Sequence, residues 1–249
     1  MIGRRALVLS GLLPAAAAVA AAEALRVLSA GAVEPALAAV LARWRSEGGG
    51  EVSVAYATAP RIAERIAAGE RPDLVLAPLS LVEQLGRAGE LAAEPVVVGS
   101  VGVGIAVREG TPVPAIRDEA SFREHLLAAD AVVFNRLSTG LHVERLLQRM
   151  GLAAQIEAKT VRFPDGAGVL RRIAAGGGRE IAFAPMTEIK MFGDRGVRFA
   201  GPLPDGLQNR TAYAAGLLSG ANGEAGGRRL LAFLGAAASR RAMAEAGVE

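Results

Sequence analysis

From residue 25 onward, the chain alternates between short apolar runs and stretches whose apolar positions recur at helical spacing. Short runs of small aliphatic residues are typical of buried strands, and each is followed by a turn rich in Gly, Ser, Thr or Pro before a helical stretch begins. Strand-turn-helix units repeated in this way are typical of an α/β fold with a mainly parallel sheet. The pattern predicts strands at residues 25–28, 52–56, 74–77, 131–134, 159–163, 180–184 and 211–218.

The stretches between these strands predict amphipathic helices that pack on the sheet. The first carries Leu37, Val40, Leu41 and Trp44 on one face, and Pro35 stands in its first turn, where its missing N–H costs nothing. Further helices are predicted around residues 62–67, 122–127, 141–150, 169–173 and 228–246.

Residues 96–107 form an apolar run that is longer than an ordinary core strand of about five or six residues. Gly99, Gly102 and Gly104 interrupt the run. A strand that leaves one lobe and enters another explains both the length and the glycines. The alternative is two strands of one sheet that are joined by a turn.

A crossing strand at residues 96–107 is expected to carry the chain from a first lobe into a second. A Pro- and Gly-rich segment at residues 201–208 is then expected to return the chain to the first lobe. We therefore expect a first lobe made of residues 23–100 and 205–249, with a second lobe, residues 101–204, inserted between its two parts.

The N-terminal residues differ from the rest of the chain. Arg4 and Arg5 give a basic start, residues 6–13 form an apolar run, and residues 15–22 are small residues suited to cleavage. This predicts a secretory signal peptide at residues 1–22 and hence a periplasmic protein. A transmembrane anchor, the alternative, needs about 20 residues that are usually more hydrophobic than a run of Ala.

Charge and composition exclude several classes of function. Removing residues 1–22, which hold two Arg and no acid, lowers the formal net charge from +3 to +1. The mature protein therefore lacks the basic footprint of a nucleic-acid-binding protein. The chain contains no Cys, which excludes disulfides, thiolate sites and a lipoprotein anchor. We expect a soluble, monomeric mature protein.

Several kinds of catalytic site are also excluded. His125 and His142 are the only histidines in the sequence, too few for a His-rich metal site. The sequence has no Gly-x-Ser-x-Gly nucleophile elbow, no P-loop, and no Gly-x-Gly-x-x-Gly after a strand. We therefore expect neither a metal nor a cofactor.

The remaining candidate chemistry lies in four strand-to-helix turns, at residues 29–32, 57–60, 136–140 and 164–168. In open α/β sheets, ligands bind outside the carboxyl ends of the strands, where such turns collect. Backbone N–H groups and hydroxyls can bind an anion there. The hydroxyls of these turns belong to Ser29, Thr58, Ser138 and Thr139. The alternative is that these residues are ordinary helix N-caps.

Five stretches of the sequence carry a resemblance to a known family. They are Val-Leu-Ser-Ala-Gly-Ala at 27–32, Ala-Thr-Ala at 57–59 with residues 65–73, Ser-Thr-Gly-Leu-His at 138–142, Glu-Ile-Ala-Phe at 180–183, and the ending at 201–216. In this order they resemble the periplasmic molybdate-binding proteins and their relatives among bacterial extracellular solute-binding proteins. The resemblance implies a type II periplasmic binding protein fold. In that fold each of two lobes is a mixed, mainly parallel sheet flanked by helices, and two crossover strands join the lobes.

The resemblance also implies a function and a set of site residues. It implies that a small anion is captured by hinge closure between the lobes and passed to an ABC importer, whose permease lies in the inner membrane. The implied ligand-binding residues are Ser29, Ala30, Gly31, Ala32, Thr58, Ala59, Ser138, Thr139, Gly140, Ala167 and Gly168.

Two arginines, together with fewer hydroxyl side chains in the turns than molybdate binders have, favour an organic acid as ligand. Molybdate binders typically have serine where this chain has Ala32, and a Ser-rich turn where it has residues 58–60. Arg61 and Arg136 flank the second and third turns, and a guanidinium matches a carboxylate in bidentate fashion. These features favour an organic carboxylate over molybdate. The alternative for each arginine is a solvated surface residue.

An enzyme is the second hypothesis, because the family also looks similar to periplasmic aconitate isomerase, which moves a double bond in a tricarboxylate without a cofactor. In that case His142 or Asp165 would shuttle the proton. The alternative for His142 is a position on the helix face outside the site. The absence of a recognised catalytic set favours the binding protein over the isomerase.

Overall fold

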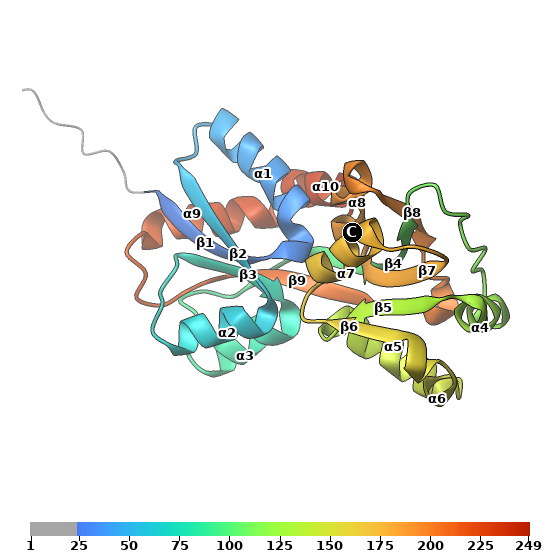
Figure 1. The fold of residues 1–249 in the computed structure, drawn as a ribbon. Coiled ribbons are helices and arrows are strands. Elements are labelled where there is room, and N and C mark those ends of the chain that lie inside the picture. The colour runs from blue at the N-terminus through green and yellow to red at the C-terminus, as the bar shows by residue number, and fades with distance from the viewer. Residues whose placement is uncertain (1–23) are drawn as a thin grey trace, which may run out of the picture.

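The computed structural model describes residues 24–249, and the predicted signal peptide at residues 1–22 lies outside them. Within the described residues, strands and helices alternate as the sequence predicts (Figure 1). No helix formed by residues 24–249 combines the length and the hydropathy that a membrane crossing needs.

The chain first builds three strand-helix units. They comprise β1 (Leu25–Ala30), the 3-10 helix η1 (Gly31–Val33), α1 (Glu34–Ser46), β2 (Val52–Ala57), α2 (Ala59–Ala67), β3 (Leu74–Pro78) and α3 (Leu79–Arg87). β1 pairs in parallel with β2 on one side and with β3 on the other. The carboxyl ends of these strands therefore face the same way and begin to form one edge of the cavity described below.

The long apolar run is one continuous strand, β4 (Val96–Arg108). Its first half pairs with β9 (Arg210–Leu217), and its second half pairs with β7 (Glu180–Pro185) and β8 (Val197–Pro202). Gly99 has a φ of 145° where the register between β4 and β9 shifts, a conformation that favours glycine. The prediction of a crossing strand is confirmed, and the alternative of two strands joined by a turn is wrong.

The second half of the chain repeats the alternation and then adds two helices at its end. Its further elements are α4 (Glu119–Ala128), β5 (Ala131–Asn135), α5 (Ser138–Arg149), α6 (Ala153–Ile156), the 3-10 helix η2 (Glu157–Lys159), β6 (Thr160–Phe163), α7 (Gly166–Ala175), α8 (Met186–Met191), the 3-10 helices η3 (Gly193–Arg195) and η4 (Asp205–Leu207), α9 (Glu224–Gly235) and α10 (Ala237–Glu245). β5 pairs in parallel with both β6 and β7.

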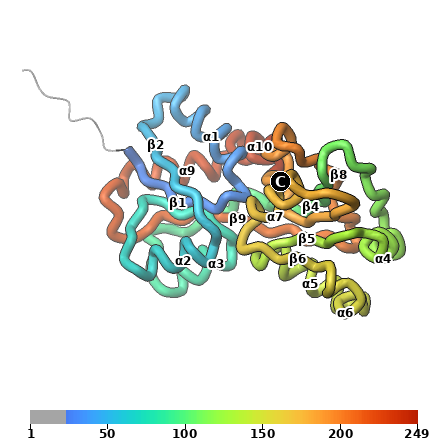
Figure 2. The backbone as a smooth tube through the Cα atoms, in the orientation of Figure 1, coloured from blue at the N-terminus to red at the C-terminus, as the bar shows by residue number. Residues whose placement is uncertain are grey.

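Within residues 24–249, nine strands form one mixed sheet. The strand order is β2-β1-β3-β9-β4-β7-β5-β6, and β8 pairs with β4 off this path. β4 and β9 run antiparallel to each other through the middle of the molecule (Figure 2). The sheet therefore continues from one half of the molecule into the other, while helices cover both of its faces (Figure 1).

The buried side chains divide into separate cores. One cluster draws only on residues 25–101 and 213–248, whereas two further clusters, on the two faces of the second part of the sheet, draw on residues 103–207. Small aliphatic residues fill most of these cores, as the low aromatic content requires. This distribution supports the lobe boundaries expected from the sequence, which stay a prediction.

The prediction of a single final helix at residues 228–246 is wrong. The structure has two helices there, α9 and α10, separated by Ala236, whose φ of −66° and ψ of 146° are extended. The break redirects the chain so that α10 packs against α1 as well as α9. Gly235, the last residue of α9, stands directly before the break; glycine disfavours a helix interior and marks helix ends, so this residue was the local signal for the break.

Candidate functional site

The four predicted turns meet at one cavity of about 500 Å³. β1, β2, β5 and β6 end at this cavity, which explains why turns far apart in sequence come together. Each turn contributes to the lining, with residues 30–32, 58–60, 136–139 and 165–167. Most of the other lining side chains are apolar or aromatic, and they include Tyr56, Leu81, Leu141, Met191, Phe192 and Tyr213.

Many of the predicted site residues line the cavity. They are Ala30, Gly31, Ala32, Thr58, Ala59, Arg136, Ser138, Thr139, Asp165 and Ala167. Five others, Ser29, Arg61, Gly140, His142 and Gly168, do not belong to its lining. A ligand-binding role for any of these residues stays a prediction, but their surroundings differ and are informative.

Ser29, Gly140 and Gly168 support the turns from within. Ser29 is fully buried in β1, and its hydroxyl donates to the carbonyl of Ala30 at 3.2 Å. The N–H of Gly140 donates to the Asn135 side chain at 3.1 Å, and a Cβ at Gly140 would lie 1.5 Å from the Asn135 carbonyl oxygen. Glycine is therefore the residue that this close approach permits.

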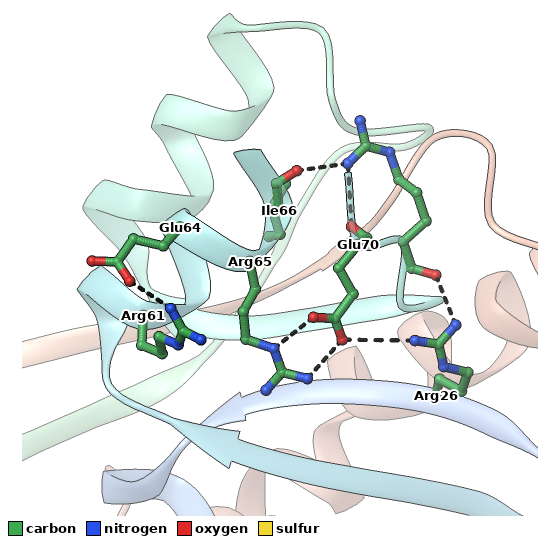
Figure 3. A network of polar contacts seen from close by, with 7 residues as sticks. Arg26, Arg61, Glu64, Arg65, Ile66 and Glu70 are labelled. Atoms are coloured by element: carbon green, nitrogen blue, oxygen red, sulfur yellow. Dashed lines mark hydrogen bonds and ion pairs between the residues drawn. The ribbon is translucent and has the colours of Figure 1, made fainter. Parts of the chain in front are cut away.

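Arg61 and His142 have partners away from the cavity. The Arg61 guanidinium is exposed and pairs with Glu64, one turn along α2, at 2.9 Å (Figure 3). In the same network Glu70 forms two hydrogen bonds of 2.6 Å with Arg65. His142 Nε2 lies 2.7 Å from the carbonyl oxygen of Leu207, so this ring ties α5 to the segment that precedes β9.

The beginnings of α2 and α5 differ from that of α7. At α7 the Asp165 carboxylate accepts a hydrogen bond from the N–H of Gly168 at 2.7 Å, the usual N-cap contact. At α2 and α5 the residues in the N-cap position are Thr58 and Leu137, and neither side chain makes a cap hydrogen bond. The interpretation as ordinary N-caps therefore applies to Asp165 and not to the hydroxyl of Thr58.

A carboxylate that the sequence analysis missed, Glu188 of α8, lies at the beginning of two of the turns. A Cβ built on Gly166 would lie 1.8 Å from Glu188 Oε2, and one on Gly31 would lie 3.9 Å from Oε1. Burial, followed by the charges of Asp165 and Glu34, raises the pKa of Glu188 from 4.5 to about 7. Glu188 stands four residues after the end of the strand predicted at 180–184, so its position at this edge of the sheet could have been expected, but not its approach to Gly166.

Two tyrosines face the same group of carboxylates. Burial and the neighbouring Glu188 charge raise the pKa of Tyr213 well above its ordinary value. Burial and the charge of Glu34 raise the pKa of Tyr56 to about 12. Both phenols therefore stay protonated at neutral pH and can donate hydrogen bonds.

The charged side chains that line the cavity are unequal in sign. Three are acidic, Glu34, Asp165 and Glu188, and one is basic, Arg136. Within the part of the chain that the structure describes, no carboxylate pairs with Arg136 and no cation pairs with Glu188. The cavity thus offers one uncompensated guanidinium and, on other elements, uncompensated carboxyl groups. It contains no metal-type cluster, because residues 24–249 bring no three His, Cys, Asp or Glu side chains together in a suitable arrangement.

Comparison with known proteins gives a consistent result for the fold. Residues 25–249 match a family described as bacterial extracellular solute-binding protein. The periplasmic molybdate-binding protein of Azotobacter vinelandii is similar in structure, with a TM-score of 0.73 and 14% identity over 90% of this chain and 98% of that chain. The sulfate-binding protein of Mycobacterium tuberculosis H37Rv is similar with a TM-score of 0.69 and 16% identity, over 90% and 85%. These likenesses confirm the predicted two-lobe α/β fold of the type II periplasmic binding proteins.

One similar sequence belongs to an enzyme. An aconitate isomerase from a Pseudomonas species is 28% identical over 232 residues, which cover 90% of this chain and 87% of that protein.

Proposed function

Because the chain belongs to the bacterial extracellular solute-binding protein family, we propose that it captures a small organic carboxylate in the cavity between its lobes and delivers it to an ABC importer. The permease in the inner membrane is then its protein partner, and the mature chain acts as a periplasmic monomer. The predicted signal peptide supports the periplasmic location.

The observation that carries the choice of ligand is the size and lining of the cavity. The cavity measures about 500 Å³ and is lined mostly by apolar side chains, which suits a ligand with a carbon skeleton. At the turns themselves, Ala32, Ala59 and Ala167 offer no hydroxyl to an oxyanion.

Arg136 and the beginning of α5 supply the complementary charge. The first N–H groups of any α-helix have no partner within the helix, so those of Ser138 and Thr139 are available to an anion. Arg136 stands just before them on the cavity wall. A guanidinium beside two helix N–H groups is a suitable cradle for one carboxylate.

Ligand-induced thermal stabilisation tests this proposal. We expect at least one mono-, di- or tricarboxylate to raise the unfolding temperature, while molybdate, tungstate and sulfate have less effect. Arg136→Ala is expected to weaken binding of that carboxylate by about tenfold or more, because a charge-assisted hydrogen bond contributes about 1.5–3 kcal/mol. Arg61→Ala is the matched control and is expected to bind normally. If no anion stabilises the protein, the proposal is wrong.

A second candidate function is isomerisation of an unsaturated carboxylate, and Glu188 favours it. A carboxyl group with a pKa of about 7 can remove a proton from one carbon and return it to another at neutral pH, which moves a double bond without net change in protons. The similarity to an aconitate isomerase supports this candidate. Incubation with cis- or trans-aconitate, followed by NMR, is expected to show exchange between the isomers if it is correct, and absence of exchange removes it for that substrate.

A further inference from the structure

The four turns of the cavity are not equivalent, because the protein's own carboxylates already lie at two of them. The Glu188 carboxylate lies against the beginning of α7 at Gly166, and it also faces Gly31 of η1. Asp165 caps α7 in addition. The N–H of Gly168 is therefore already satisfied by a carboxylate, and the negative charge of Glu188 beside Gly166 and Gly31 disfavours a second anion at these two turns.

An anionic group of a ligand would meet repulsion at this end of the cavity. Glu188 is surrounded by Asp165 of the α7 turn, Glu34 of α1, the phenol of Tyr213 on β9, and the backbone at Gly31 and Gly166. None of these groups is a cation. Lys190, two residues further along α8, is exposed and lies over the ring of Phe199 instead.

The other two turns have the opposite character. Those at α2 and α5 bring no acidic side chain to the cavity, and Arg136 lies on the second of them. Within residues 24–249 Arg136 forms no ion pair with an acidic side chain, and the charges that shift the pKa of Glu188 are those of Asp165 and Glu34. The guanidinium and the buried carboxylate therefore lie at different turns of the cavity.

From this separation we infer that the ligand is a bipolar organic acid. Its carboxylate lies at Arg136 and the beginning of α5, and a hydrogen-bond donor, an ammonium or hydroxyl group, lies at Glu188. The inference rests on the proposed function, since it specifies which organic carboxylates the same cavity accepts. It also explains why the ionisable carboxyl group of Glu188 lies at turns that would otherwise bind a second anion.

Straight-chain acids of equal length that differ only at the far end test the inference. The series is butanoate, 4-hydroxybutanoate, 4-aminobutanoate and succinate, with the corresponding series one carbon shorter and one carbon longer. Isothermal titration at pH 8 measures the affinity of each for the wild-type protein. We expect the hydroxyl- or ammonium-bearing acid to bind about tenfold or more tightly than the methyl-bearing acid, and the dicarboxylate to bind most weakly.

Glu188→Gln identifies the group responsible. This variant keeps the size of the side chain and removes its charge, so we expect it to lose the preference for the ammonium-bearing acid by about tenfold and to bind the dicarboxylate better than the wild type does. Glu64→Gln, on the exposed face of α2, is the control and keeps the wild-type order. Circular dichroism checks that both variants are folded.

The wild-type series alone can overturn the inference, whatever happens to the variant. If the dicarboxylate or the methyl-bearing acid binds as tightly as the donor-bearing acids, the ligand is not bipolar, although the proposed capture of a carboxylate stands. If only a tricarboxylate binds, the inference of a bipolar ligand is again wrong, while the proposed capture of a carboxylate stands. If no acid of the series and no anion of the wider panel binds, the proposed function fails together with the inference.

Discussion

Glu188 gives the most direct test of the electrostatics of the cavity, because its charge affects stability without any ligand. The carboxyl group has a pKa of about 7 in the folded protein, compared with 4.5 as its ordinary value. Each unit between two pKa values corresponds to about 1.4 kcal/mol. Above pH 7 the ionised group therefore destabilises the fold by about 3 kcal/mol relative to a neutral one.

The direction follows from proton binding. Between pH 4.5 and about 7, the folded protein holds a proton on Glu188 that the unfolded chain has released. The contribution of Glu188 to the free energy of unfolding therefore decreases as pH rises through this window, which is the opposite of a salt-bridged carboxylate. Glu188→Gln has no such proton, so its advantage over the wild type should grow from about zero at pH 4.5 to about 3 kcal/mol at pH 8.

Urea denaturation at several pH values measures this difference. Urea is preferred to guanidinium chloride because it does not screen charges. The signal is the fluorescence of the single tryptophan, Trp44, which is buried and donates to the carbonyl of Gly50. Subtracting the wild-type curve from the variant curve cancels the other titrating groups. Glu64→Gln, at an exposed ion pair, is expected to show a small difference that does not depend on pH.

A constant difference between wild type and Glu188→Gln from pH 5 to pH 8 would refute the reasoning. It would mean that Glu188 is ionised across the whole range and that the neighbouring carboxylates do not act on it. A difference that grows in the opposite direction would point to an unrecognised cation near the group.

Two further predictions concern packing around the turns. Thr187→Val removes the 2.6 Å hydrogen bond from the Thr187 hydroxyl to the Ala32 carbonyl, which joins α8 to the first turn. We expect the free energy of unfolding to fall by about 1–3 kcal/mol and the melting temperature, measured by calorimetry, to fall by about 2–10 °C. An unchanged melting temperature would contradict this. Gly140→Ala places a Cβ 1.5 Å from the Asn135 carbonyl oxygen, so we expect the free energy of unfolding to fall by about 3 kcal/mol or more. The control is Gly177→Ala, whose Cβ lies in open space and which should have the melting temperature of the wild type. Equal melting temperatures for the two variants would count against the close approach.

The parts of the structure that depend on local sequence could be predicted. The length and glycines of the run at 96–107 indicated β4, because a strand is recognised from its own residues. The four turns were located because each follows a short apolar run directly. The ion pair of Arg61 with Glu64 could also be read from the sequence, since residues three apart on a helix are neighbours.

The parts that depend on distant residues could not be predicted. Glu188 is brought to Gly166 only by the folding of β7 and α8 beside α7, and no local pattern reports that approach. Ser29 was assigned to a turn because β1 was expected to end at residue 28, but the strand continues to Ala30 and buries the hydroxyl.

The position of β9 in the sheet has a consequence for the order in which the sheet can form. β9 is the last strand along the chain, yet it lies between β3 and β4 and is the neighbour that joins them. Strands β4 to β8, by contrast, come from one uninterrupted segment, residues 96–202. A nascent chain that has not yet reached residue 210 can thus pair the second part of the sheet, while β3 still has an open edge. The joint between the lobes is therefore the last part of the sheet that synthesis makes available.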